Sequence, residues 1–228
     1  MKSIILIAAP AAGKGTEAVK IKEEYKIPHI STGDLLRAAV AKGDKRGNEI
    51  NELISNGKFV SDEIVLELLK ERILQNDCKQ GYILDGFPRN LEQAKAYDNI
   101  LEEIDKEIGI VIVLDIDKEI AKSRISGRWS CPKCGKVYNT NNPDMKPKND
   151  GLCDECNIEL TRRSDDNPDT YEERYNTYIS KTEPLISYYN EKGIVYHVDS
   201  SKNAIETHKQ VVKILGELKW LVLKLQEK

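Results

Sequence analysis

The sequence predicts an α/β fold in which a parallel five-stranded sheet is flanked by helices, with one small insertion. Short apolar runs alternate with helical patterns along most of the chain, which is typical of βαβ units. The first run, residues 3–9, is continuously apolar, as expected of a strand buried on both faces. From Trp129 to about Leu160 this periodicity stops and Cys, Asn, Pro, Asp and Lys accumulate, which indicates an insertion of about 30 residues.

The other strands are expected at 28–30, 82–84, 110–114 and 194–198. A helix should run from the loop after the first strand to about residue 24. Further helices are expected at 32–42, 47–56, 62–75, 90–103, 117–127 and 169–192. The last 25 residues predict one amphipathic helix with a stripe formed by Ile205, His208, Val212, Leu215, Leu218, Val222 and Leu225.

Composition excludes several classes of function. The chain has 228 residues, of which 39% are hydrophobic, enough for a sizeable core. Its 35 basic and 38 acidic residues give a formal charge of −3, without the basic excess that general nucleic-acid binding requires. The apolar start at 4–9 is too short for a signal peptide or a membrane span. We therefore expect a cytoplasmic protein with no nucleic-acid or membrane partner.

A glycine-lysine loop follows the first strand. Gly13, Lys14, Gly15 and Thr16 stand between a strand and a helix, the context in which a phosphate-binding loop aims backbone N–H groups and a lysine at an anion. The first glycine of that pattern is replaced by Ala8. An ordinary Gly-Lys turn is the simpler interpretation, but the strand–loop–helix context favours the phosphate site, with Lys14 as the phosphate ligand.

Four of the five cysteines form two CxxC pairs, Cys131–Cys134 and Cys153–Cys156. Two such pairs at this separation can close a tetrahedral site of four thiolates around zinc. Four cysteines leave no open coordination position, so the metal should be structural rather than catalytic. It would hold together an insertion too small and polar to form its own core. Cys78 stands apart and is expected to be a buried thiol.

Arginine is scarce and unevenly placed. Only 9 of the 35 basic residues are Arg, and six of the nine stand where they could converge on phosphates: Arg37, Arg89, Arg124, Arg128, Arg163 and Arg174. Guanidinium groups remain charged when packed around a polyphosphate and bind it in a forked geometry. Asp85 directly follows a predicted strand, where an acid can orient Mg²⁺ beside a phosphate loop.

These stretches together resemble the long-type bacterial adenylate kinases that carry a zinc-binding lid, and the resemblance covers nearly the whole chain. It rests on PAAGKGT, STGDLLR, GKFVSDEI, ILDGFPR with Gln93, the Arg124–Gly127–Arg128 turn, the CxxC pairs, TRRSDDNPDT with Arg174, and VDSSK. The resemblance implies the P-loop nucleoside-monophosphate kinase fold. It divides the chain into a core (1–30, 61–126 and 165–228), an AMP-binding segment (31–60) and a zinc lid (127–164).

The resemblance further implies reversible phosphoryl transfer from MgATP to AMP, giving two ADP, by a monomer. The residues that would bind ATP are Ala11, Ala12, Gly13, Lys14, Gly15, Thr16, Arg128, Val137, Tyr138 and Lys202. Those that would bind AMP are Thr32, Arg37, Lys58, Phe59, Val60, Gly86, Phe87, Pro88, Arg89, Gln93, Arg163 and Arg174. The catalytic set would be Lys14, Asp85, Arg89, Arg124, Arg128, Arg163 and Arg174, and the zinc ligands Cys131, Cys134, Cys153 and Cys156.

The chain departs from the family pattern at Ala8 and Ala11, where the family has glycine. If either position requires a positive φ, alanine costs on the order of 1 kcal/mol and weakens ATP binding or turnover. Three alternatives stay open at this point. They are a kinase for UMP, CMP or GMP, a zinc-ribbon binding module, and a nucleotide binder weakened in catalysis by the two alanines.

Overall fold

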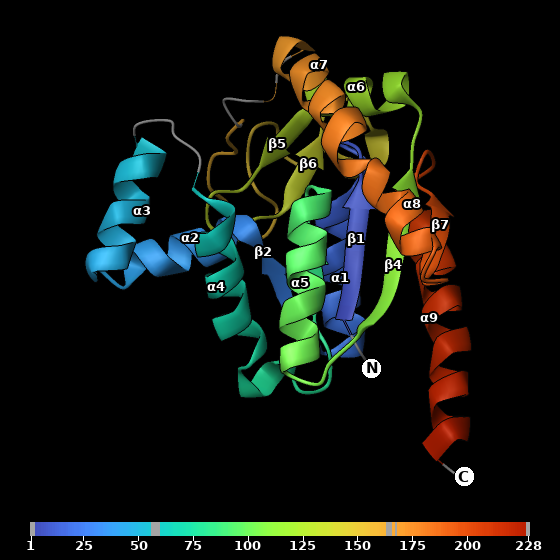
Figure 1. The fold of residues 1–228 in the computed structure, drawn as a ribbon. Helices are drawn as coiled ribbons and strands as arrows, with labels where there is room; N and C mark the ends of the chain where they lie inside the picture. The colour runs from blue at the N-terminus through green and yellow to red at the C-terminus, as the bar shows by residue number, and fades with distance from the viewer. Residues whose placement is uncertain (1–2, 56–59, 163–165, 167, 227–228) are drawn as a thin grey trace.

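A parallel five-stranded sheet forms the centre of the molecule (Figure 1). The computed structural model describes residues 3–55, 60–162, 166 and 168–226. The strands run in the order β2-β3-β1-β4-β7, and each neighbouring pair is parallel. Their bounds are β1 (Ser3–Ala8), β2 (His29–Ser31), β3 (Ile83–Asp85), β4 (Ile108–Asp115) and β7 (Val195–Asp199). All five strands predicted from the sequence are confirmed.

The two faces of the sheet carry separate apolar cores because successive strand residues point to opposite sides. Ile5 and Ile7 of β1 pack on one face, against α4 (Asp62–Ile73), α5 (Leu91–Glu103) and α8 (Pro184–Asn190). Ile4 and Leu6 pack on the other face, against α1 (Lys14–Tyr25) and α9 (Ala204–Gln226). Burial on both faces explains why β1 is a continuous apolar run in the sequence.

Short polar residues start several of the helices. Ser31 accepts a hydrogen bond from Asp34 N (3.1 Å) at the start of α2 (Thr32–Ala41). Asn90 accepts one from Gln93 N (2.8 Å) at the start of α5. Asp117 accepts one from Glu119 N (2.8 Å) at the start of α6 (Lys118–Ser126). Such caps satisfy backbone N–H groups that have no partner inside the helix, and they set where each helix begins.

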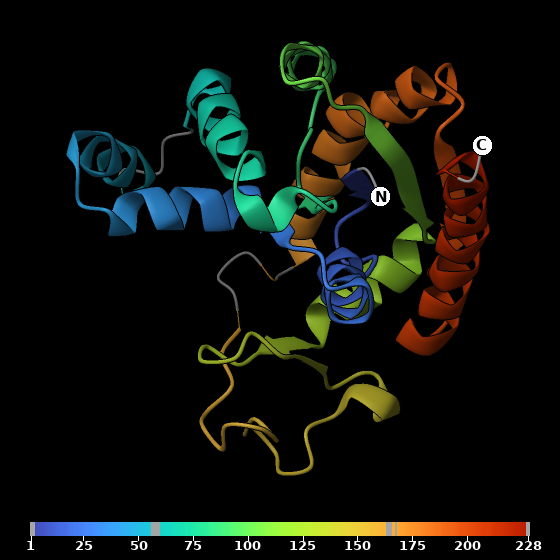
Figure 2. The same ribbon diagram turned by 90° about the horizontal axis from the view of Figure 1, so that it is seen from below.

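Two segments stand away from the sheet in different directions (Figures 1 and 2). The first contains α2 and α3 (Lys45–Ser55). The second is the insertion, in which β5 (Arg128–Ser130) pairs antiparallel with β6 (Val137–Asn139). Short 3₁₀ turns lie at η1 (Asn76–Cys78) and η2 (Pro143–Met145).

The structure alters two of the predicted helices. The helix expected over 169–192 is divided into α7 (Pro168–Thr177), a π-helical turn η3 (Tyr178–Thr182) and α8. In α9, the predicted stripe is wrong at Ile205, which is 63% exposed, whereas Val211 and Leu215 are buried. His208 belongs to the inner side through its polar contacts, 2.7 Å from Glu17 and 2.9 Å from Glu24, rather than through apolar packing.

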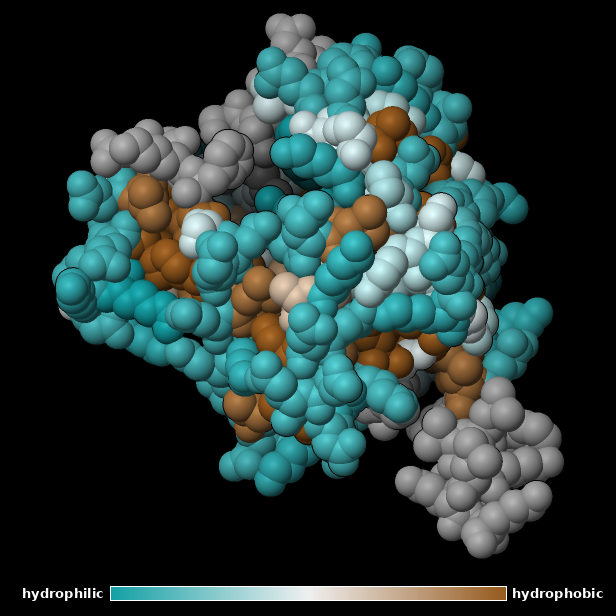
Figure 3. Space-filling view, viewed as in Figure 1, coloured by the Kyte–Doolittle hydropathy of each residue, from teal (hydrophilic) through white to brown (hydrophobic). Residues whose placement is uncertain are grey.

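Hydrophilic residues cover most of the face in Figure 3, with smaller groups of apolar residues over the region of α2, α3 and α4. Within the described part of the chain, no helix combines the length and the apolar content needed to cross a membrane.

Candidate active site

The loop between β1 and α1 has the conformation expected of an anion-binding site. Gly13 precedes α1 with φ of 95°, a left-handed conformation that glycine adopts without steric penalty. The first backbone N–H groups of α1 have no partner within the helix, so they are available to a phosphate together with the positive end of the helix dipole. Lys14 is the first residue of α1, and Gly15 and Thr16 complete its first turn.

The two alanines of this loop differ in conformation. Ala11 has φ of 64°, so the expectation of a positive φ is confirmed there. Ala8 is the last residue of β1 and pairs with Leu114 of β4, so it is extended and needs no glycine. Ala11 also packs against the apolar cluster of Ala121, Ile125 and Tyr171, which offsets part of its strain. The backbone penalty is therefore confined to one position.

Asp85 ends β3 beside the phosphate loop. Its Oδ1 lies 3.5 Å from Lys14 Nζ, and its Oδ2 lies 3.2 Å from His29 Nε2 on the adjacent strand β2. Burial by itself would raise the pKa of Asp85, but the His29 hydrogen bond and the charge of Lys14 hold that pKa below its ordinary value. The carboxylate is consequently ionised at neutral pH. Sequence reasoning missed His29, since only the pairing of β2 with β3 brings it to Asp85.

A second group of predicted residues is assembled next to this site. The Arg89 guanidinium donates to Gly86 O (2.8 Å) and to Thr32 Oγ1 (3.1 Å). The backbone N–H of Arg89 donates to Gln93 Oε1 (2.7 Å), and Gln93 Nε2 in turn donates to Asp62 Oδ1 (2.6 Å). Arg89 and its chain neighbours Gly86 and Gln93 are thus joined in one network to two distant residues, Thr32 and Asp62.

Other residues assigned to AMP take no part in this hydrogen-bond network. Arg37 pairs with Asp34 (2.6 Å), and its side chain is 73% exposed. Phe87 is buried and packs edge-on against Tyr97, so only its backbone remains for a ligand. Pro88 is buried as well, and Val60 packs against the sheet core. Lys58 and Phe59 lie outside the described residues.

Two lid-side arginines converge on one carboxylate. Arg128 makes a two-pronged contact with Asp166, with Nε 2.7 Å from Oδ2. Arg174 Nη1 lies 3.9 Å from Asp166 Oδ1. The Asp166 side chain is only 1% exposed, and removing such a partner from a buried pair is strongly destabilising. Arg163 lies outside the described residues.

Arg124 lies with a different group. Its Nη2 donates to the carbonyls of Ser201 (3.0 Å) and Lys202 (2.5 Å). Burial lowers its pKa, and nearby Asp199 opposes that shift. A cavity of about 540 Å³ is lined here by Arg124, Asn139, Asn141, Ser201, Lys202 and Asn203, among others. Arg124 thus lies beside Lys202, one of the residues that the resemblance assigned to ATP.

The two residues of β6 that were assigned to ATP, Val137 and Tyr138, have different surroundings. The hydroxyl of Tyr138 donates to Cys153 Sγ (3.4 Å) and accepts from Asp154 N (2.8 Å), so this side chain belongs to the cysteine cluster. Val137 is half-buried. Asn139, which sequence reasoning missed, lines the cavity and donates to Arg124 O (2.9 Å). The sequence could have pointed to Asn139 through its position directly after Tyr138, which was assigned to ATP.

The four lid cysteines come together as their spacing predicts. Their sulfur atoms all lie within 4.8 Å of one another, and Cys134 Sγ is 3.7 Å from Cys153 Sγ. Thiolates about 2.3 Å from a tetrahedral zinc would lie about 3.8 Å apart. Desolvation opposes ionisation of Cys153, but hydrogen bonds from Tyr138 and from backbone N–H groups lower its pKa to about 6. The donor set therefore fits a structural metal.

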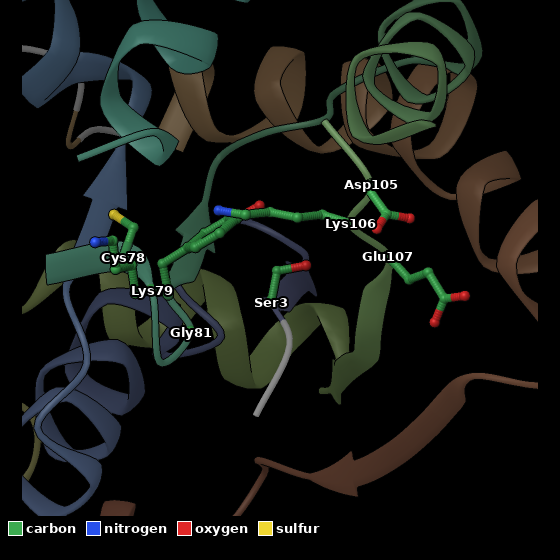
Figure 4. A pocket seen from close by; sticks show the side chains of 8 residues that line it. Ser3, Cys78, Lys79, Gly81, Asp105, Lys106 and Glu107 are labelled. Atoms are coloured by element: carbon green, nitrogen blue, oxygen red, sulfur yellow. The ribbon is translucent and has the colours of Figure 1, made fainter. Parts of the chain in front are cut away.

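A further cavity, of about 330 Å³, lies at the opposite edge of the sheet (Figure 4). It is lined by the segments that precede β3 and β4 and by the start of β1: Ser3, Cys78, Lys79, Gly81, Tyr82, Asp105, Lys106 and Glu107. This lining shares no residue with the phosphate loop or the arginine groups, so the cavity is separate from the site described above.

A phosphate loop with its lysine, an arginine network at the same edge of a parallel sheet and a lid insertion define the class of P-loop nucleotide kinases. Comparison with known proteins narrows this class to one family. The family model described as adenylate kinase matches residues 6–194. The chain therefore belongs to the adenylate kinase family, and the resemblance drawn from the sequence is confirmed.

Several curated relatives match almost end to end. "Adenylate kinase" of Kosmotoga olearia is 46% identical over 216 residues, covering 95% of this chain and 100% of the relative. "Adenylate kinase" of Archaeoglobus fulgidus is 46% identical over 217 residues, covering 95% and 99%. "Adenylate kinase" of Lachnoclostridium phytofermentans is 44% identical over 215 residues, covering 94% and 98%.

Proposed function

We propose that this chain catalyses reversible transfer of a phosphoryl group from MgATP to AMP, giving two ADP. One observation carries the proposal. The phosphate loop with Lys14 follows β1, the Arg89 network follows the neighbouring parallel strand β3, and both therefore lie at the carboxyl ends of the strands. Two phosphate-bearing substrates bound at these groups would face each other. Membership of the adenylate kinase family supports the assignment.

The chemistry requires positioning and charge neutralisation rather than a general base, because the transition state of phosphoryl transfer is loose. The loop from Ala11 to Thr16 binds the ATP phosphates, and Lys14 contacts the group in transfer. Arg89 binds the phosphate of AMP, with Thr32 and Gln93 near the acceptor base. Asp85 orients the Mg²⁺ of the MgATP substrate, a role that suits an ionised carboxylate 3.5 Å from Lys14.

The lid-side arginines complete the site when the enzyme closes. We assign Arg128, Arg163 and Arg174 to the phosphates, and Arg124 to the end of the site that holds the ATP base. Asp166 keeps Arg128 ordered until a phosphate competes for it. The segments 31–60 and 127–164 are the ones that close, which excludes water and protects the phosphoryl group from hydrolysis.

Zinc is the metal we assign to the four lid cysteines, in a structural role. The sulfur separations, the tyrosine hydroxyl on Cys153 and the polar character of the lid support this assignment. Reduced thiols are stable in the cytoplasm, where we place the enzyme. We also propose that it acts as a monomer, for which light scattering should give a mass near 25.8 kDa.

A coupled assay with MgATP tests the function. AMP, UMP, CMP and GMP are offered in turn, and ADP formation is expected with AMP alone. Lys14→Met should lower kcat by at least about a hundredfold, since it removes the positive charge at the transferred group. Lys22→Met, the same change at an exposed position of the same helix, should leave kcat unaltered.

Other outcomes of this assay have distinct meanings. Turnover with UMP, CMP or GMP in place of AMP would make the chain a kinase for another monophosphate. Tight nucleotide binding without turnover would make it a weakened binder, with Ala11 as the residue to revert first.

A further inference from the structure

The helix that leads away from the lid has a local irregularity. Between α7 and α8, residues Tyr178–Thr182 form a π-helical turn, in which Glu183 N donates to Tyr178 O (2.9 Å), five residues back. Pro184 follows and opens α8. Proline has no N–H for the carbonyl four residues earlier, so the regular α-helical pattern is interrupted here. Such turns widen a helix by one residue and redirect the side chains that follow.

The redirected side chain makes one long-range contact. Thr182 Oγ1 donates a hydrogen bond to the backbone carbonyl of Arg89 (2.9 Å), although 93 residues separate the two. Two neighbouring hydroxyls of the arm, the stretch formed by α7 and η3, donate hydrogen bonds within that arm instead. Thr177 Oγ1 donates to Glu173 O, and Ser180 Oγ donates to Asn176 O (both 2.9 Å). Thr182 therefore differs from its neighbours in reaching the AMP side of the site.

This contact completes the fixation of Arg89. Gln93 holds the backbone N–H of Arg89, and Gly86 and Thr32 hold its guanidinium. Thr182 holds the remaining polar backbone group, the carbonyl. Arg89 lies in a turn between β3 and α5, where no regular hydrogen-bond ladder fixes the backbone. A guanidinium that must meet a phosphate in line with the donor gains from a fixed backbone.

We propose that Thr182 is a positioning residue for Arg89, and that the π-helical turn exists to bring its hydroxyl to the Arg89 carbonyl. Thr182 ends η3, which continues directly from α7, and α7 carries Arg174, which lies 3.9 Å from Asp166. The arm formed by α7 and η3 thus holds groups on both the lid side and the AMP side of the site. This inference rests on the proposed function, because it concerns the residue that binds the phosphate of AMP.

The test compares three variants of the full-length protein. Thr182→Val removes the hydroxyl but keeps the side-chain shape, Thr182→Ser restores the hydroxyl, and Thr177→Val makes the matched change in the same arm. KM for AMP, KM for MgATP, kcat and Tm are measured for each. Thr182→Val should raise KM for AMP about three- to tenfold, the size expected for one neutral hydrogen bond. Its KM for MgATP should stay within about twofold of the wild-type value.

Thr182→Ser and Thr177→Val should keep the wild-type KM for AMP. An unchanged KM for AMP in Thr182→Val overturns the proposal. So does a parallel rise of both KM values with a lower Tm, since that pattern describes a merely structural residue. The wild-type assay separates the proposed function from the role of Thr182. If the wild-type enzyme turns over AMP and the Thr182→Val variant has the same KM for AMP, the function is retained and only this inference is contradicted.

Discussion

In the central sheet, Ile4 to Ile7 of β1 are each at most 2% exposed, and apolar layers cover both sides. In the lid, the apolar cluster consists of Cys131, Tyr138, Cys153 and Leu160, with three partly buried neighbours. Two of those four residues, Cys131 and Cys153, belong to the cysteine cluster that could hold a metal. The sheet is stabilised by burial of apolar surface. The lid has little such surface, and we propose that it relies on a metal bound by its four cysteines.

The closure proposed above requires one part to move while the other stays fixed, and this contrast is suited to that requirement. A segment with a small apolar cluster of its own loses little packing when it swings, provided that a local crosslink keeps it folded. The junction between the two regions is polar: Asn139 Nδ2 donates to Arg124 O, and Asn141 Nδ2 donates to Ser123 O (3.0 Å). Polar junctions exchange partners with water more readily than apolar ones do.

The largest effect should come from breaking the lid crosslink. Cys153→Ser, or removal of metal with a chelator, should unfold the lid and abolish efficient turnover, while the sheet core keeps its unfolding transition. Metal analysis, the fluorescence of Trp129 in the lid and calorimetry check this. Cys78→Ala is the control, because Cys78 lies outside the cluster and its loss should not change the metal content. Full metal occupancy with three cysteines would contradict the assignment.

A substitution that opens a cavity in the sheet should destabilise the core and leave the lid unchanged. Ile112 of β4 is fully buried, so Ile112→Ala should lower the free energy of unfolding by about 2–5 kcal/mol. Its metal content should remain one per chain. Ile205→Ala, the same change at a residue 63% exposed, should have little effect on the denaturation midpoint. Loss of metal from the Ile112 variant would show that the two regions depend on each other.

A substitution at the junction between sheet and lid should moderately lower both the stability and kcat. A Cβ on Gly127 would lie 2.3 Å from Asn139 Oδ1 and 2.9 Å from Asn141 N. Gly127→Ala should therefore cost about 1–3 kcal/mol by overpacking and lower kcat, with the metal retained. A Cβ on Gly216 in α9 meets nothing within 4 Å, so Gly216→Ala should be neutral or slightly stabilising. Equal behaviour of the two variants would rule out the junction as the cause.

The smallest effects are expected at Ala8 and Ala11, and of the two only Ala8→Gly should measurably lower the stability. Ala11→Gly relieves a positive φ worth about 1 kcal/mol but loses a methyl contact of about 0.8 kcal/mol, so its stability should barely change. Ala8→Gly puts glycine inside a strand and should cost about 0.5–1 kcal/mol. Chemical denaturation and the KM for MgATP measure both. A clear gain from Ala8→Gly would contradict the extended conformation.

The sequence predicted most of the site where short motifs carry their own geometry. Lys14 and its glycines act through a local loop, and the four cysteines through two tight turns, so spacing was sufficient. Prediction failed where contacts are long-range. His29 meets Asp85 only through strand pairing, and the Tyr138 hydroxyl meets Cys153 only because the lid folds back on itself. The assignment of Arg37 to AMP stays a prediction, and in the structure its side chain pairs with Asp34.

By itself, the sequence determined the order of strands and helices, the phosphate loop and the cysteine cluster, because apolar periodicity and local motifs act within a few residues of chain. The tertiary structure alone decided how the functional groups are paired. Asp166 holds Arg128, the carbonyls of Ser201 and Lys202 hold Arg124, and Thr182 holds the Arg89 backbone. Each of these contacts joins residues at least 38 positions apart, and only strand order and helix packing bring such residues within hydrogen-bonding distance.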